Sequence, residues 1–67
     1  MILADRLKYE RLNRGMTQFQ FAELLETNRS AIGYYENGRI PLPVSLKKFS
    51  NILKVDLAKE LIEGKTN

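Results

Sequence analysis

Four residues that lie close together in the sequence could contact nucleic-acid bases: Arg29, Ser30, Gly33 and Tyr34. Three have side chains that can contact bases, and the glycine permits close approach of a base to the backbone. An arginine guanidinium can bond a guanine edge, a serine hydroxyl can bond a base edge, and a tyrosine ring can touch a thymine methyl group. If these positions belong to one helix, they lie on the side that faces away from the core. That side is suited to reading base edges in the DNA major groove.

Each of these four residues also has a purely structural explanation. Arg29 can be a solvated side chain, although a cation in the first turn opposes the helix dipole and so favours an external anion or a guanine edge. Ser30 is an ordinary first-turn residue, and Tyr34 can cover the first helix. Gly33 costs a helix about 1 kcal/mol relative to alanine, which either close approach to DNA or a helix–helix contact would explain.

A capping signal precedes each of two short helical patterns. Thr17 and Gln20 have the T-x-x-Q spacing of a capping box, which predicts a helix over residues 18–25. Asn28 is suited to cap the next helix, which we expect over residues 29–36. The short connection predicts a helix-turn-helix, whose second helix fits the major groove.

The apolar residues of these two patterns predict how the helices pack. Phe21 and Ala22 fall on one side of the first helix, and Ile32 and Tyr35 fall on one side of the second. A small residue such as Ala22 permits the close crossing that a short turn demands. The polar residues of the second helix are therefore expected to face outward.

Four motifs cover nearly the whole chain: RLKYERLNRGMTQ, TQFQFAELL, NRSAIGYYENGR and FSNILKVDLAKEL. Together they resemble the Cro/CI-type, or Xre-type, helix-turn-helix family of phage and bacterial repressors. Two positions depart from the family pattern, because Glu26 and Lys54 stand where a helix-ending glycine is usual. A left-handed conformation there costs a non-glycine residue about 1 kcal/mol or more, so the turn at Glu26 is expected to be either wider or strained.

The resemblance implies further roles. Arg11 and Glu36 occupy the positions of an ion pair that tethers the second helix of the motif, and Gln18 occupies the position of a glutamine that bonds a phosphate. The resemblance places a dimer surface on the last helix, although its three apolar residues could equally close the core. These residues are Leu57, Leu61 and Ile62.

Positive charge is concentrated in one part of the chain. Residues 27–54 carry five basic residues and one acidic residue, whereas the whole chain has a net charge of +3. This distribution is typical of phosphate contacts, and a solvated basic face is the alternative. The residues that we expect to contact phosphates are Gln18, Asn37, Arg39, Lys47 and Lys48.

Three further helices are expected to hold the motif in place. They lie over residues 4–13, over residues 44–53 and after Asp56, and Leu12 is expected to join the core from the first of them. No segment alternates apolar and polar residues as a strand would. We therefore predict an all-α, five-helix domain over residues 1–63 with a loose tail over residues 64–67.

Composition argues against several other classes of protein. The chain has no cysteine and no histidine, which removes the usual metal ligands, disulfides and the commonest general base. No catalytic residue, metal or cofactor is expected. Asp5 and Arg6 interrupt the apolar start, so neither a signal peptide nor a membrane span is indicated, and a cytoplasmic protein, nucleoid-associated when bound to DNA, is expected.

The sequence as a whole predicts a regulator, a repressor in particular, that binds a pseudo-palindromic operator in double-stranded DNA as a homodimer. No small-molecule ligand is expected, because the chain leaves no room for a separate sensing domain. The alternative is a protein-binding module, such as an antitoxin or an adaptor that uses the same fold to cover a protein partner. A long tail for wrapping a partner would favour that alternative, and only four residues follow Glu63.

Overall fold

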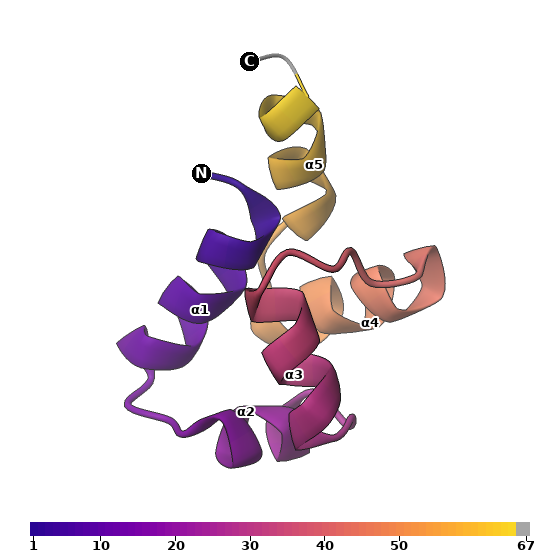
Figure 1. The fold of residues 1–67 in the computed structure, drawn as a ribbon. Coiled ribbons are helices and arrows are strands. Elements are labelled where there is room, and N and C mark those ends of the chain that lie inside the picture. Colours follow the sequence, from indigo (N-terminus) through magenta and orange to yellow (C-terminus); the bar gives the residue numbers. More distant parts are fainter. Residues whose placement is uncertain (66–67) are drawn as a thin grey trace.

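Five α-helices account for most of the chain in the computed structural model, which describes residues 1–65 and the side chains of residues 1–61. No strand occurs among these residues, which confirms the predicted all-α fold. In chain order the helices are α1 Leu3–Asn13, α2 Gln18–Leu24, α3 Arg29–Glu36, α4 Pro43–Leu53 and α5 Leu57–Lys65 (Figure 1).

The helix bounds differ from the predicted ones by a residue or two. α3 has the predicted bounds, α2 ends one residue earlier, and α1 begins one residue earlier. α4 begins at Pro43, which occupies the first helical position, where its missing N–H leaves no bond unmade. α5 runs to Lys65, past the predicted domain end at residue 63, and residues 66–67 lie outside the described part.

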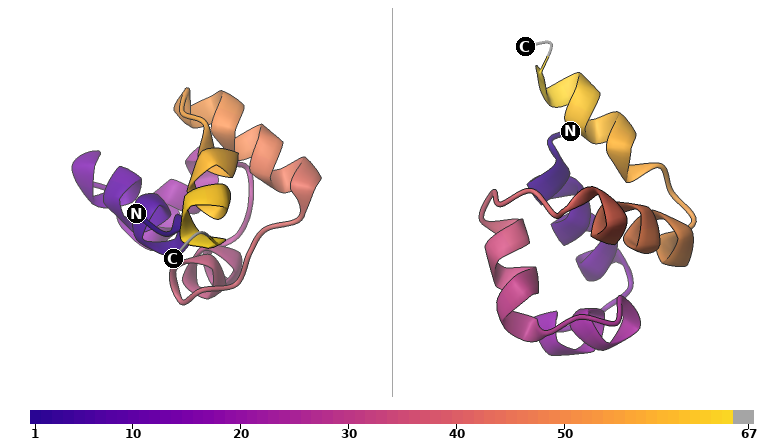
Figure 2. Two further views of the ribbon diagram at one scale, coloured as in Figure 1. Left: turned by 90° about the horizontal axis from the view of Figure 1, so that it is seen from above. Right: turned by 90° about the vertical axis from the view of Figure 1, so that its right-hand side faces the viewer.

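Each helix packs on neighbours that bury its apolar side. α2 packs on α3, α4 packs on α5, and α1 contacts both α3 and α5. Figures 1 and 2 place α2 and α5 at opposite ends of the molecule, with the N-terminal segment at the α5 end. The shared core consists of Leu3, Leu7, Phe21, Ala22, Leu25, Ile32, Leu46, Phe49, Leu53 and Leu57.

Leu12 does not join the core, so that prediction was wrong. Its side chain is 57% exposed. Leu12 lies five positions after Leu7, which turns it about 140° around the helix from the buried side. Glu10 takes the place on the inner side instead and is buried.

Arg6 of α1 bonds two buried carboxylates, Glu10 of the same helix and Glu60 of α5. Arg6 donates from Nε to Oε2 of Glu10 at 2.8 Å and from Nη1 to Oε1 of Glu60 at 3.0 Å, and Arg14 pairs with the other Glu10 oxygen. Burial by itself raises the pKa of the Glu10 carboxyl, but the hydrogen bonds from Arg14 and Arg6 outweigh it and the pKa is lowered. The hydrogen bond to Glu10 is the main reason that the pKa of Arg6 is raised.

The first four helices all end with the same hydrogen-bonded motif. A residue with positive φ follows each helix, and the next amide donates to the carbonyl five residues before it, as in a Schellman motif. Two of these residues are glycines, whereas Glu26 and Lys54 both have φ of 59°. The turn at Glu26 is therefore the strained one of the two alternatives, not the wider one, and Lys54 adopts the same conformation. The four residues are Gly15, Glu26, Gly38 and Lys54.

Candidate nucleic-acid interface

The capping residues predicted from the sequence fix where α2 and α3 begin. The Thr17 hydroxyl accepts from the Gln20 amide at 3.1 Å while the Thr17 amide donates to the Gln20 side chain at 2.9 Å, which completes the capping box. Asn28 accepts from the Ala31 amide at 2.8 Å at the start of α3. Ile32 is 1% exposed and anchors the inner side of α3, so the opposite side faces solvent.

The outer side of α3 carries the residues predicted to read bases. Arg29, Ser30 and Tyr34 are exposed, and Gly33 lies between them with intermediate exposure. A shallow depression of about 300 Å³ joins this side of α3 to the start of α2. The depression is lined by Gln18, Arg29, Ser30, Gly33, Tyr34 and Asn37, so the structure brings all four predicted base-reading residues and two predicted phosphate contacts together.

Gly33 has no packing reason to be glycine. A Cβ built at this position would meet no heavy atom within 4 Å. The helix–helix contact considered from the sequence is therefore absent at Gly33. The glycine instead leaves the floor of the depression open, at a cost to the helix of about 1 kcal/mol.

Arg29 has no internal partner for its charge. It takes the first position of α3 and is exposed, and within the described residues its guanidinium makes neither an ion pair nor a hydrogen bond. A cation at a helix N-terminus is unfavourable by itself. The side chain is thus available to an external acceptor beside the depression.

The C-terminal end of α3 carries a second cation. The Arg39 guanidinium lies 4.8 Å from the centre of the Tyr34 ring, within the range of a cation–π interaction. The Asn37 side chain donates to the Gly33 carbonyl at 2.9 Å, which turns it back along the helix. Stacking on Tyr34 holds the Arg39 charge beside the outer side of α3.

Glu36 ties α3 to α1 and α2. Arg11 donates to its two oxygens at 2.7 and 3.1 Å, and Gln18 donates to Oε1 at 3.2 Å. The Arg11 and Glu36 side chains are only 12% and 6% exposed. The predicted ion pair is therefore present, and the Gln18 side chain also contributes to positioning α3.

The two lysines of α4 differ in their surroundings. Lys48 donates to the Glu26 carbonyl at 3.1 Å, and its Nζ lies 5.7 Å from the Phe49 ring centre. It therefore braces the turn between α2 and α3, a contact that sequence reasoning missed. Lys47 is exposed and borders another depression, between α4 and α5.

The residues predicted to form a dimer surface do not share one exposed surface. Leu57 is 0% exposed and belongs to the core, so its assignment to a dimer surface was wrong. The reason is that the start of α5 is held against α4, where the Leu57 amide donates to the Ser50 hydroxyl at 3.2 Å. Leu61 packs partly buried against the core, and the side chain of Ile62 lies outside the described residues.

The structure offers no sign of a metal centre or a membrane span in the part that it describes. Among residues 1–61, no group of three or more acidic residues is placed to hold a metal ion. No described helix is both long and apolar enough to cross a bilayer.

Comparison with known protein families gives a match. A family model described as helix-turn-helix matches residues 7–59, which is about four fifths of the chain. The match includes all of α2, α3 and α4 and the outer side of α3 described above. No curated protein and no solved structure gives a significant match.

Proposed function

Because the chain belongs to the Xre/Cro-type helix-turn-helix family, whose members are DNA-binding regulators, we propose that it is a repressor that binds a pseudo-palindromic operator as a dimer. The main support is the outer side of α3. It gathers three exposed side chains that can contact bases around an open depression, and the helix is fixed from behind by Ile32 and Glu36.

Each residue on this side has a distinct role in the proposal. Arg29 donates to the O6 and N7 acceptors of a guanine, and the Ser30 hydroxyl bonds an adjacent base edge. Tyr34 contacts a thymine methyl group. Gly33 lets the base edges approach the backbone of α3, since its position lacks a Cβ in an open depression.

Phosphate contacts on both sides of the groove hold α3 in register. Arg39 is suited to this role because its stacking on Tyr34 limits the freedom that it would lose on binding. Lys48 keeps two of its three N–H donors for a phosphate after bonding Glu26. Gln18, Asn37 and Lys47 complete the proposed set.

A dimer follows from the amount of sequence that one helix can read. A single recognition helix contacts only a few base pairs, which gives too little selectivity against a genome. Two copies that read half-sites about 34 Å apart double the contacted sequence. Such a protein acts in the cytoplasm, associated with the nucleoid when bound.

Substituting one base-reading and one phosphate-contacting residue tests the proposal. Arg29→Ala is expected to relax the preference at one base position of each half-site, at a cost of about 1–3 kcal/mol. Lys47→Ala, the matched loss of one positive charge, is expected to weaken binding to all sequences alike. It is also expected to lower the slope of log affinity against log salt concentration by about one. Binding to a panel of single-base operator variants measures both. A uniform loss for Arg29→Ala would show that it contacts only phosphate.

A further inference from the structure

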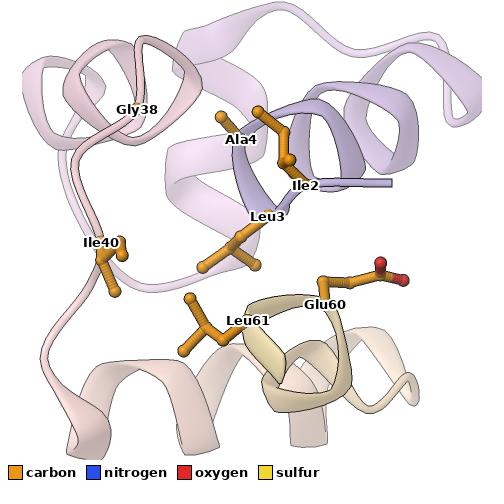
Figure 3. Close-up of a pocket in the computed structure, with 7 residues that line it drawn as sticks. All are labelled: Ile2, Leu3, Ala4, Gly38, Ile40, Glu60 and Leu61. Atoms are coloured by element: carbon orange, nitrogen blue, oxygen red, sulfur yellow. The ribbon is translucent and has the colours of Figure 1, made fainter. Parts of the chain in front are cut away.

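Gly33 differs from the glycines that end helices, because neither its backbone nor its packing requires a glycine. Gly15 and Gly38 have φ of 67° and 116°, at which other residues are strained. Gly38 also lines an apolar groove between the N-terminal segment, the loop after α3, and α5 (Figure 3). Gly33 has no positive φ, and an added Cβ would meet no heavy atom of the described residues within 4 Å. A ligand outside the chain is therefore the remaining reason for the missing side chain.

The backbone at Gly33 has no hydrogen-bonding group to spare for such a ligand. Its carbonyl accepts from the Asn37 amide at 3.1 Å and from the Asn37 side chain at 2.9 Å. A carbonyl oxygen has two lone pairs, so both are used. The Gly33 amide lies in the interior of α3, where helix geometry directs it to the carbonyl four residues earlier. The floor of the depression at Gly33 is therefore its Cα, an apolar surface.

An apolar floor suits one group among the base edges of the major groove. Those edges carry hydrogen-bond donors and acceptors, and thymine adds a C5 methyl group. A polar group pressed against the floor would lose its bonds to water without gaining others. We propose that Gly33 receives the C5 methyl group of a pyrimidine, and that binding responds to this methyl group in thymine and in 5-methylcytosine alike. This inference rests on the proposed function, because it names the base that α3 reads at one position.

The side chain next to Gly33 supplies an apolar wall for the methyl group. Tyr34 is 55% exposed and lines the same depression. The Arg39 guanidinium lies 4.8 Å from the centre of its ring, and this stacking limits the movement of the ring. A methyl group on the Gly33 Cα is thus bordered by an aromatic side chain that is already held in place.

The position of Gly33 on α3 also predicts where the methylated base lies in the half-site. Gly33 follows Arg29 by four positions, which is about 6 Å along the helix axis. Successive bases of one strand are about 3.4 Å apart. The methylated pyrimidine is therefore expected one or two base pairs from the guanine that we assign to Arg29.

A methyl group on the protein and a methyl group on the base would compete for the same space. Carbon atoms in contact are about 3.5–4.0 Å apart, and a carbon–carbon bond is about 1.5 Å long. The Cβ of Gly33→Ala would lie only about 2–2.5 Å from a thymine methyl seated on the Cα. Uracil lacks that methyl group and would restore an ordinary contact with the alanine.

Exchange of thymine for uracil tests the proposal, because it removes a methyl group and keeps every hydrogen-bonding group. Each thymine is exchanged in turn in an operator selected from random duplexes. At one thymine of a half-site, uracil is expected to lower the affinity of the parent chain about fourfold, the effect of one buried methyl group. Gly33→Ala is expected to reverse this preference by about fivefold or more. Asn51→Ala, at an exposed position of α4 outside the depression, is the matched control and keeps the parent preference.

Cytosine methylation gives a second measurement at the same position. With a cytosine–guanine pair placed there, the parent chain is expected to bind 5-methylcytosine about fourfold more tightly than cytosine. Gly33→Ala is expected to prefer the unmethylated base. Equal affinities for methylated and unmethylated bases, or an unchanged preference in Gly33→Ala, would overturn this proposal while sequence-specific binding remains. Failure to select any operator would instead overturn the proposed function, and this proposal with it.

Discussion

Alanine at position 33 is expected to stabilise the fold and weaken DNA binding at the same time. Gly33 lies inside α3, where alanine is favoured over glycine by about 1 kcal/mol. Nothing in the structure offsets this gain, because the added Cβ meets no atom within 4 Å. For a domain of this size the gain corresponds to a rise in the melting temperature of about 4–8 °C.

The same methyl group enters the space that the proposal gives to DNA. Gly33 forms part of the depression between Arg29, Ser30 and Tyr34. Overfilling a close-packed contact costs about 1–3 kcal/mol, which corresponds to about a 5- to 150-fold loss of affinity. Opposite changes in stability and affinity are expected at a position that is kept open for a ligand.

Thermal unfolding followed by circular dichroism measures the first effect, and fluorescence anisotropy with a labelled operator measures the second. Asn51→Ala is a matched control, because Asn51 is exposed in α4 and gains helix propensity without lining the depression beside α3. The control is expected to raise the melting temperature and leave affinity unchanged. If Gly33→Ala binds the operator as well as the parent chain, DNA does not approach this part of α3 and the reasoning fails.

Three further predictions concern the frame that holds α3. Arg11→Met should destabilise the fold less than Glu36→Ala, because methionine keeps much of the side-chain volume of arginine. Alanine at position 36 leaves a 12% exposed guanidinium without its carboxylate, at a cost of about 3 kcal/mol. Equal losses of stability in urea unfolding would contradict this difference. Glu26→Gly should stabilise by about 1 kcal/mol, because glycine removes the strain of φ 59°, and an unchanged urea midpoint would show that the turn is unstrained. The lowered pKa of Glu10 gives stability that is present above the ordinary value of 4.5 and is lost as the pH falls through it and on through the lower folded-state pKa. Glu10→Gln should flatten that part of the pH profile of the melting temperature, and a profile as steep as that of the parent chain would assign the dependence to other carboxylates.

Local signals in the sequence predicted much of the fold. Thr17, Gln20 and Asn28 define the starts of α2 and α3 because capping depends on side chains within three residues. The family pattern placed Glu26 and Lys54 at helix-ending positions, where both have positive φ, but it left open whether the turn at Glu26 is wider or strained. The Arg11–Glu36 pair was predicted from the same resemblance.

Features that depend on tertiary packing were not predicted. No local pattern indicated that Lys48 bonds the Glu26 carbonyl, because the two residues are 22 positions apart and meet only after α4 has docked. Leu57 was assigned to a surface because an apolar residue of a terminal helix can face either inward or outward. One signal for the exposed apolar side chains of the connection before α4 was available, since Ile40 and Leu42 are apolar residues in a segment that would normally be polar.

Selection from a randomised pool of DNA duplexes tests the central proposal most directly. The purified protein is titrated into the pool, and the affinity for the selected sequence is compared with that for scrambled DNA at two salt concentrations. We predict an inverted repeat with half-sites about one helical turn apart and a preference of about 10³-fold or more. The contradicting result is that no motif is selected, and that binding is weak on every sequence and falls equally with salt. A protein would then be the main partner.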